Sequence, residues 1–221
     1  SFFVSPLFSQ EFVDREINAV NSEFLMHIKE DGWRQYNLMS SLLGDPAHPA
    51  NRFSIGNLET LTKSDEGALR NKLVEFYNMH YSADKMYFVA VSSTPIDQYK
   101  SEVLNQLGQV PNHETATVTK GPRLNSSNMG RVTSMKGLLD RRSVEIQFRI
   151  PNQTEQYDRS ATAYIASLLG DEGYGSAYDY LRQKGWASAL YVGSEEYSEE
   201  ESLLTVDISL SKEGYEHKDE V

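Results

Sequence analysis

The chain has 221 residues, of which 21 are Lys or Arg and 32 are Asp or Glu, so its formal net charge is −11. This negative charge argues against non-specific binding to nucleic acid or anionic lipid, because both need a basic surface. The absence of cysteine excludes disulfide scaffolds, Cys-bound zinc, iron–sulfur clusters and thiol nucleophiles. The mean hydropathy of −0.53 and the short apolar runs predict no membrane span.

In the first half of the chain, the apolar spacing predicts mostly helices. Phe12, Ala19 and Val20 recur at helical spacing within residues 9–31. The continuous apolar run at 86–92 predicts a buried strand. Further helices are expected over 33–43, 65–81 and 95–107, and an irregular loop over 45–62.

The second half opens with a stretch over 108–128 that is rich in Thr, Pro, Gly and Asn, as is typical of a linker. Beyond it, the alternation in SVEIQFRI at 143–150 predicts a strand with one buried face. Short connections between adjacent strands predict an α+β fold with a mostly antiparallel sheet. The other expected strands lie over 130–136, 187–194 and 202–210, and the helices over 155–169 and 176–184.

Two carboxylates lie on one side of the first predicted helix. Glu16 and Glu23 are seven residues apart, which returns to within about 20° of the same side of a helix. Ala19 and Val20 lie between them, and a carboxylate pair on an apolar stripe is costly unless a metal or a cation binds it. The alternative is the exposed acidic side of an ordinary surface helix. His27 and Glu30 extend the stripe, a pattern that suits a metal but is also common on surface helices.

The other candidate motifs give weaker evidence for a catalytic or ligand-binding site. The glycine-rich stretch at 170–175 lacks the Lys-Ser/Thr ending of a phosphate loop and contains two acids, so it predicts a turn between helices. No serine lies in a G-x-S-x-G context, and no histidine lies in H-E-x-x-H or H-x-x-E-H. The charge is uneven, since residues 195–221 are strongly acidic. That segment predicts a solvated surface or a surface that selects charged partners.

The run DREINAVNSE at 14–23 resembles the segment after the active-site helix in the pitrilysin and insulin-degrading-enzyme family of zinc metalloendopeptidases, the inverzincins. The resemblance covers nearly the whole chain and implies a pitrilysin-like fold, with two homologous two-layer domains in tandem. It implies the later part of the catalytic domain over 1–115, a linker over 116–128, and the larger, N-terminal part of a second, non-catalytic domain over 129–221. Other matching stretches are DGWR at 31–34, His48-Pro49, Gly56-Asn57, FRIP at 148–151 and Gly185-Trp186.

In that family, two His of an H-x-x-E-H helix and one downstream Glu hold the zinc. The resemblance places the downstream ligand at Glu23, and Glu16 as the acid that orients a zinc-bound His. Trp33 and Tyr36 fall where the family has aromatic residues lining the cleavage pocket, with core packing as the alternative for Trp33. Because the chain has no H-x-x-E-H, the resemblance implies an inactive fragment of a protein that hydrolyses peptides with metal-activated water in an enclosed chamber.

The relatives also hold the N-terminal end of their substrates by strand pairing, at the turn and strand that correspond to Gly170, Leu190 and Val192. These three residues are therefore candidates for peptide binding. The relatives often carry His where this chain has Ser167 and Asp171, so the chain departs from the family pattern within this same candidate site.

The implied cofactor is zinc, and the implied partners are peptide substrates, with no nucleic acid and no membrane span. A homo-oligomer and a cytoplasmic or periplasmic location are left open. Two alternatives remain at this stage: a non-catalytic structural or assembly relative of the same fold, and a peptide-binding module. An intact H-x-x-E-H upstream would favour the protease, and peptide affinity without zinc would favour the module.

Overall fold

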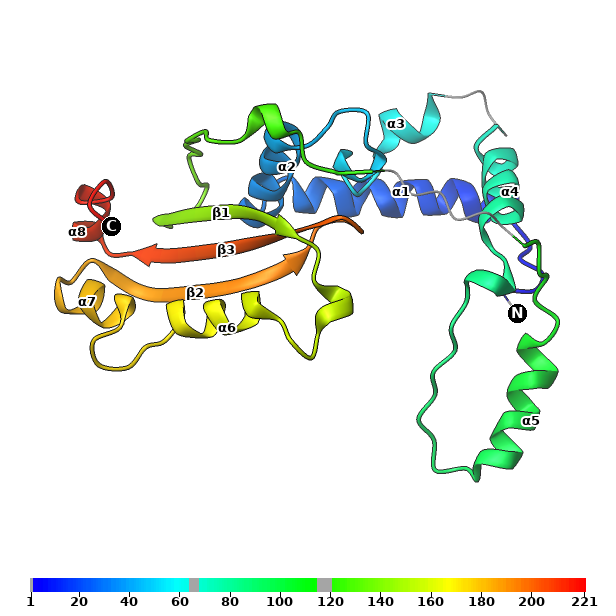
Figure 1. Ribbon diagram of the computed structural model, residues 1–221. Helices are drawn as coiled ribbons and strands as arrows, with labels where there is room; N and C mark the ends of the chain where they lie inside the picture. Colours follow the sequence, from blue (N-terminus) through cyan, green and yellow to red (C-terminus); the bar gives the residue numbers. More distant parts are fainter. Residues whose placement is uncertain (1, 64–67, 115–120) are drawn as a thin grey trace. The chain divides into compact units, whose positions relative to one another are not determined.

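The computed structural model describes residues 2–63, 68–114 and 121–221 (Figure 1). Its contacts group residues 1–27 with 54–118, here called the helical unit, and residues 28–53 with 119–221, here called the sheet unit. The compact units therefore do not follow chain order, and the tandem-domain division at 116–128 stays a prediction. Within the described ranges, no helix is both long and apolar enough to cross a membrane.

The helical unit is held together by capping and aromatic contacts. Asn21 in the first helix accepts a hydrogen bond from the backbone N–H of Leu58 at 2.9 Å, which fixes the start of α3. Tyr77 is buried and donates its hydroxyl to the carbonyl oxygen of Phe3 at 2.7 Å. The helices in the described part of this unit are α1 Gln10–His27, α3 Leu58–Thr62, α4 Ala68–His80 and α5 Ile96–Leu107.

These bounds confirm most of the helices expected here, with two corrections. The loop expected over 45–62 ends in α3, and the strand expected over 86–92 is wrong because that stretch is irregular. Tyr87 is 98% exposed and Val91 is 100% exposed. A strand requires a neighbour for its backbone N–H and C=O groups. No strand pairs with this run within the described residues.

An antiparallel sheet organises the sheet unit (Figure 1). Its strands are β1 Ser143–Pro151, β2 Ala187–Glu196 and β3 Glu201–Leu210, in the order β1-β3-β2. They confirm the strands expected over 143–150, 187–194 and 202–210, and the α+β class. Because β3 lies in the middle, β2 is an edge strand of this sheet.

The two faces of the sheet differ in chemistry. Directly paired residues share a face, so Val144 lies beside Ile208 on an apolar face. By the same register, Glu145 lies beside Asp207 on a polar face. In Figure 1, the helices α6 Ala161–Leu169 and α7 Ala177–Gln183 lie alongside β2, and they pack against the apolar face of the sheet. The core there includes Leu181, Trp186, Ala187, Ile208 and Leu210, next to the short α8 Lys212–Glu216.

On the polar side, α2 (Asp31–Leu43) is fixed by its first residue. The Asp31 carboxylate accepts hydrogen bonds from the backbone N–H groups of Leu138 and Leu139, at 2.8 and 3.0 Å. These bonds, with that from Arg34, hold the pKa of the Asp31 carboxyl below its usual value. The chain is thus anchored at 138–139. The strand expected over 130–136 is wrong, because that stretch is irregular and pairs with no strand among the described residues.

The end of the expected linker is packed into the sheet unit. Arg123 is 8% exposed and donates hydrogen bonds to Asn51 Oδ1 at 2.7 Å and to the Tyr36 hydroxyl at 2.8 Å. Its guanidinium carbon lies 3.8 Å from the centre of the Tyr197 ring, a cation–π contact. The packed segment therefore joins α2, the loop after it and the end of the β2–β3 hairpin.

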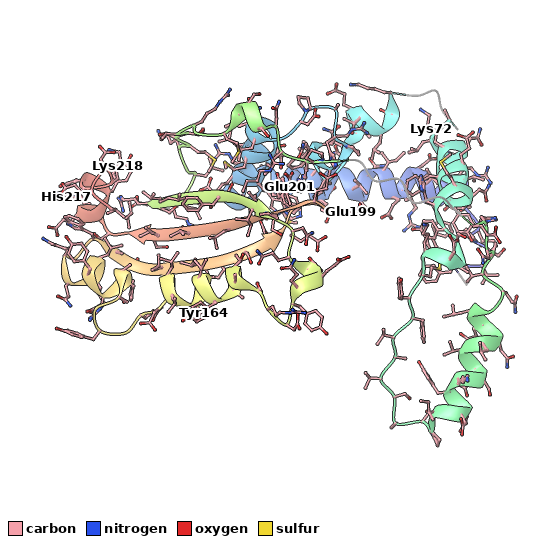
Figure 2. The ribbon with its side chains drawn as sticks, viewed as in Figure 1. Lys72, Tyr164, Glu199, Glu201, His217 and Lys218 are labelled. Atoms are coloured by element: carbon pink, nitrogen blue, oxygen red, sulfur yellow. The ribbon has the colours of Figure 1, made fainter. Side chains whose placement is uncertain are left out.

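The Glu201 carboxylate is a second buried anchor, and it is 1% exposed. One oxygen accepts a hydrogen bond from the backbone N–H of Leu124 at 2.6 Å, and the other lies 2.7 Å from Arg149 Nε. Figure 2 shows Glu201 and Glu199 near the end of the β2–β3 hairpin. A buried carboxylate needs both partners, because removing either one leaves an uncompensated polar group.

We expect Glu201→Ala to lower the free energy of unfolding by about 3 kcal/mol, because Arg149 and the Leu124 N–H then lose their buried partner. Urea denaturation followed by tryptophan fluorescence measures the change. Glu199→Ala, at an exposed position of the same hairpin, is the matched control and should change stability by less than about 0.5 kcal/mol. Equal effects of the two substitutions would show that Glu201 is not an anchor.

The polar face gives a pH-dependent prediction at Glu145. Burial, and then the neighbouring Asp207 carboxylate, raise the pKa of the Glu145 carboxyl. The folded chain therefore binds this proton more tightly than the unfolded chain, and stability falls as the pH rises through the folded pKa. Gln35 and Gln147 both donate to Glu145, and Gln147 Oε1 has no partner among the described residues, so its amide can turn.

Glu145→Gln should accordingly melt at a higher temperature than the parent at neutral pH, and the difference should shrink as the pH approaches 4.5. Thermal melts of both proteins across this range test the prediction. A variant that is less stable than the parent at neutral pH would contradict it.

Candidate functional site

The two carboxylates predicted to act near a metal lie on α1, in the helical unit. Glu16 and Glu23 are both exposed, and the Glu23 side chain is 55% exposed. Glu23 Oε1 lies 3.8 Å from Nε2 of His27, one helical turn further along. The pair is therefore an exposed acidic side of a helix in this structure, and no burial of charge is needed to explain it.

Zinc needs more donors than α1 provides. Catalytic zinc is held by three protein ligands and keeps a fourth position open. No group of three or more His, Cys, Asp or Glu side chains is placed to hold a metal within residues 2–63, 68–114 and 121–221. The exposed carboxylate of Glu23 could serve as one ligand of a metal ion whose other ligands lie outside the described residues. The described residues alone do not complete a zinc site.

Trp33 and Tyr36 lie on α2, in the sheet unit. Their rings meet edge to face with centroids 6.4 Å apart, and Trp33 also packs on Phe53 at 5.9 Å. Tyr36 is 41% exposed, and its hydroxyl accepts the hydrogen bond from Arg123. Both residues therefore have packing roles here, and their place in a cleavage pocket stays a prediction.

The three residues predicted to bind peptide come together in one groove. Gly170 follows the end of α6, and Leu190 and Val192 lie on β2. They line a groove of about 650 Å³ between the helix and the strand. A Cβ added to Gly170 would lie 3.5 Å from Val192 Cβ, an ordinary van der Waals distance, so the end of the helix lies next to the strand.

Small side chains on α6 create the width of this groove. The helix turns Ala163, Ala166 and Ser167 toward β2, with Gly170 at its end, and this spacing places all four on one side of a helix. The large side chains lie on its other side, where Tyr164 is 67% exposed (Figure 2). The helix therefore contacts β2 through its narrowest side.

The groove follows the open edge of β2. Its lining includes every residue from 190 to 194, although side chains in a strand alternate between the two faces. Consecutive residues can line the same groove only along the strand's backbone edge. β2 pairs with β3 on its other edge, and no strand covers this one within the described residues. Its outward N–H and C=O groups therefore suit an added strand.

The turn at one end of the groove is held in place by Asp179. This buried carboxylate accepts hydrogen bonds from the Gly175 N–H at 3.0 Å and from Arg182 at 2.8 Å. The bond from Gly175 and the one from Arg182 hold the pKa of the Asp179 carboxyl below its usual value. The charged carboxylate at neutral pH thus fixes the path of the chain between α6 and α7.

Sequence reasoning found three lining residues and missed the others. The signal for the helical side was present, because small residues recur at positions 163, 166, 167 and 170. The same predicted helix also contains the large apolar residues Tyr164, Ile165, Leu168 and Leu169, so the side with the small residues did not stand out. That helix is a short 3₁₀ turn, Thr154–Gln156, followed by α6. The lining residues that were not candidates are Ala163, Ala166, Ser167, Asp171, Glu172, Tyr191, Gly193 and Ser194.

Comparisons with known proteins agree with this architecture. The profile of the family described as "Peptidase M16 inactive domain" matches residues 68–221. The A-factor-processing enzyme of Saccharomyces cerevisiae is 31% identical over 220 residues, which cover 98% of this chain and 21% of that enzyme. The insulin-degrading enzyme of Drosophila melanogaster is 30% identical over 225 residues, which cover 100% of this chain and 22% of that enzyme.

The crystal structure of pitrilysin is similar in fold. It superposes with a TM-score of 0.86 at 27% sequence identity, over 98% of this chain and 23% of pitrilysin. The chain thus spans about a fifth of the length of the curated relatives it matches.

Proposed function

Because the chain belongs to the peptidase M16 family, we propose that it is the substrate-holding part of a zinc metalloendopeptidase. In this proposal, the full protein hydrolyses peptides, while the 221-residue chain alone binds them without cutting. The observation that carries the proposal is the groove between α6 and the open edge of β2.

The groove would take an extended peptide as a further strand. Neighbouring strands lie about 4.8 Å apart, and the lining residues 190–194 match a peptide of about five residues. Backbone pairing supplies affinity that is independent of the peptide sequence, and the side chains toward α6 meet the small residues at 163, 166 and 167. Such a site suits an enzyme part that must hold many different peptides.

Glu23 would contribute the zinc ligand of this chain. Its carboxylate is exposed on α1, and a zinc ion held with its help would polarise the bond that is cut and activate water. The remaining ligands would come from outside the described residues. Glu16, on the same side of the helix, would orient a ligand by hydrogen bonding rather than bind the metal itself.

To test the groove, Ser167→Leu fills it from the helical side. We expect the affinity of the chain for a fluorescein-labelled extended peptide, measured by fluorescence polarisation, to fall by at least about tenfold. A peptide with N-methylated backbone amides should lose binding to a similar degree, since it cannot complete the strand pairing.

Tyr164→Leu is the matched control, because Tyr164 lies on the other side of α6 and is 67% exposed. It should leave peptide affinity unchanged, and circular dichroism should show that both variants keep their helices. Equal binding by the parent and the Ser167→Leu variant would remove the groove from the proposed function.

To test the metal ligand, Glu23→Gln is made in the full-length protein. We expect both the bound zinc, measured by elemental analysis, and peptide hydrolysis to be lost, because a neutral amide is a poor replacement for a carboxylate ligand. Glu16→Gln should reduce activity less, and Glu11→Gln, another exposed acid of α1, should leave it unchanged. Full zinc content in the Glu23→Gln protein would refute the assignment.

A further inference from the structure

The apolar face of the sheet is covered unevenly. On β3, the core residues Ile208 and Leu210 are 5% and 7% exposed. On β1, Ile146 is 42% exposed and Phe148 is 50% exposed, although their pairing with β3 places both on the same face as Val144. A folded chain normally buries such a face, so the part of it over β1 is left without a cover.

The position of the helices explains why this part is open. In the described part of the chain, α6 and α7 contact the sheet mainly at β2, and α8 contacts it at β3 (Figure 1). β1 lies two strands away from β2, which is a distance of about 10 Å. Packed helices lie about 8–10 Å apart, so a layer of helices that begins with α6 beside β2 has room for one further helix over β1.

The side of α6 that faces this space is also apolar. Its buried residues Thr162 and Ala166 mark the side of the helix that meets the sheet. At about 100° per residue, the groove-lining residues lie on one flank of that side, and Ile165 and Leu169 lie on the other. Ile165 is 46% exposed and Leu169 is 44% exposed. The uncovered apolar face, as it is called below, consists of Ile146, Phe148, Ile165 and Leu169.

The size of the uncovered apolar face argues against a second copy of the chain as its cover. Four large apolar side chains that are each about half exposed offer roughly 350 Å² of surface. A stable interface between separate proteins takes about 800 Å² from each partner. A segment that is joined covalently to the chain can dock on a smaller area, because its effective concentration is already high.

We propose that the uncovered apolar face is the docking surface for an amphipathic helix supplied by the rest of the full-length polypeptide. The chain spans 21% and 22% of the two curated relatives described above, so most of such a protein lies outside it. A helix fits better than a strand, because the exposed groups are side chains and because the space continues the layer of α6. The inference does not depend on peptide binding, since the groove lies on the other flank of α6.

Thiol reactivity tests for the cover, because the chain has no cysteine of its own. Phe148→Cys and Ile146→Cys each place one thiol on the uncovered apolar face. We expect a small maleimide to modify either thiol at least about tenfold more slowly in the full-length protein than in the 221-residue chain, measured by mass spectrometry of the peptide that contains it. Glu199→Cys, at an exposed position of the hairpin end, is the control and should react at similar rates in both proteins.

A photo-crosslinker at the same position identifies the segment that covers the face. p-Benzoylphenylalanine in place of Phe148 keeps an aromatic ring there and forms a bond to a neighbouring residue under light. In the full-length protein, we expect the crosslinked residues to belong to the same polypeptide, outside the 221-residue chain. They should lie three or four residues apart, as on one side of a helix.

Three results would overturn the inference in different ways. Equal reaction rates of the Phe148→Cys thiol in the two proteins would show that the face stays open in the full-length protein. Crosslinks between two copies, or a reaction rate in the 221-residue chain that falls as its concentration rises, would identify a second copy as the cover. Crosslinks to every second residue of a segment would identify a strand in place of a helix.

Discussion

The sheet unit depends on the buried carboxylate of Glu201. This side chain begins β3, yet its two oxygens bind the backbone of Leu124 and the guanidinium of Arg149 on β1. Burying a charge is costly, so the loss of either partner would destabilise the sheet unit. The carboxylate thereby connects the segment around Leu124 to the paired strands β1 and β3.

Arg123 is the buried cation of the same segment, and its polar contacts are of a different kind. Its neighbours are the neutral oxygens of Asn51 and Tyr36 and the ring of Tyr197, rather than a carboxylate. Burial raises the pKa of the Tyr197 hydroxyl, so this ring stays neutral beside the cation. Arg123 thus provides a buried cation, and the N–H of the next residue, Leu124, binds a buried carboxylate. The two contacts together hold this segment in one position against the sheet unit.

The sequence predicted the elements whose signal is local. Alternation in 143–150 predicted β1 correctly, because one face of that strand is apolar and the other polar. The run at 86–92 has an equally strong apolar signal, but burial requires neighbouring strands, and no local pattern reports whether they are present. Gly170, Leu190 and Val192 line one groove, and their role in binding peptide stays a prediction. Their groove could not be predicted, because it depends on which side of α6 meets β2.

The orientation of α6 relative to β2 also explains why the groove stays open in the folded chain. A helix as apolar as α6 would normally bury its largest side chains, and here Tyr164, Ile165 and Leu168 stay 46–67% exposed. Turning them toward β2 would fill the groove and cover the open strand edge. Instead, Gly170 lies next to Val192, and the small side chains of the helix line the groove along β2. The orientation of α6 therefore leaves the outer edge of β2 without a paired strand among the described residues.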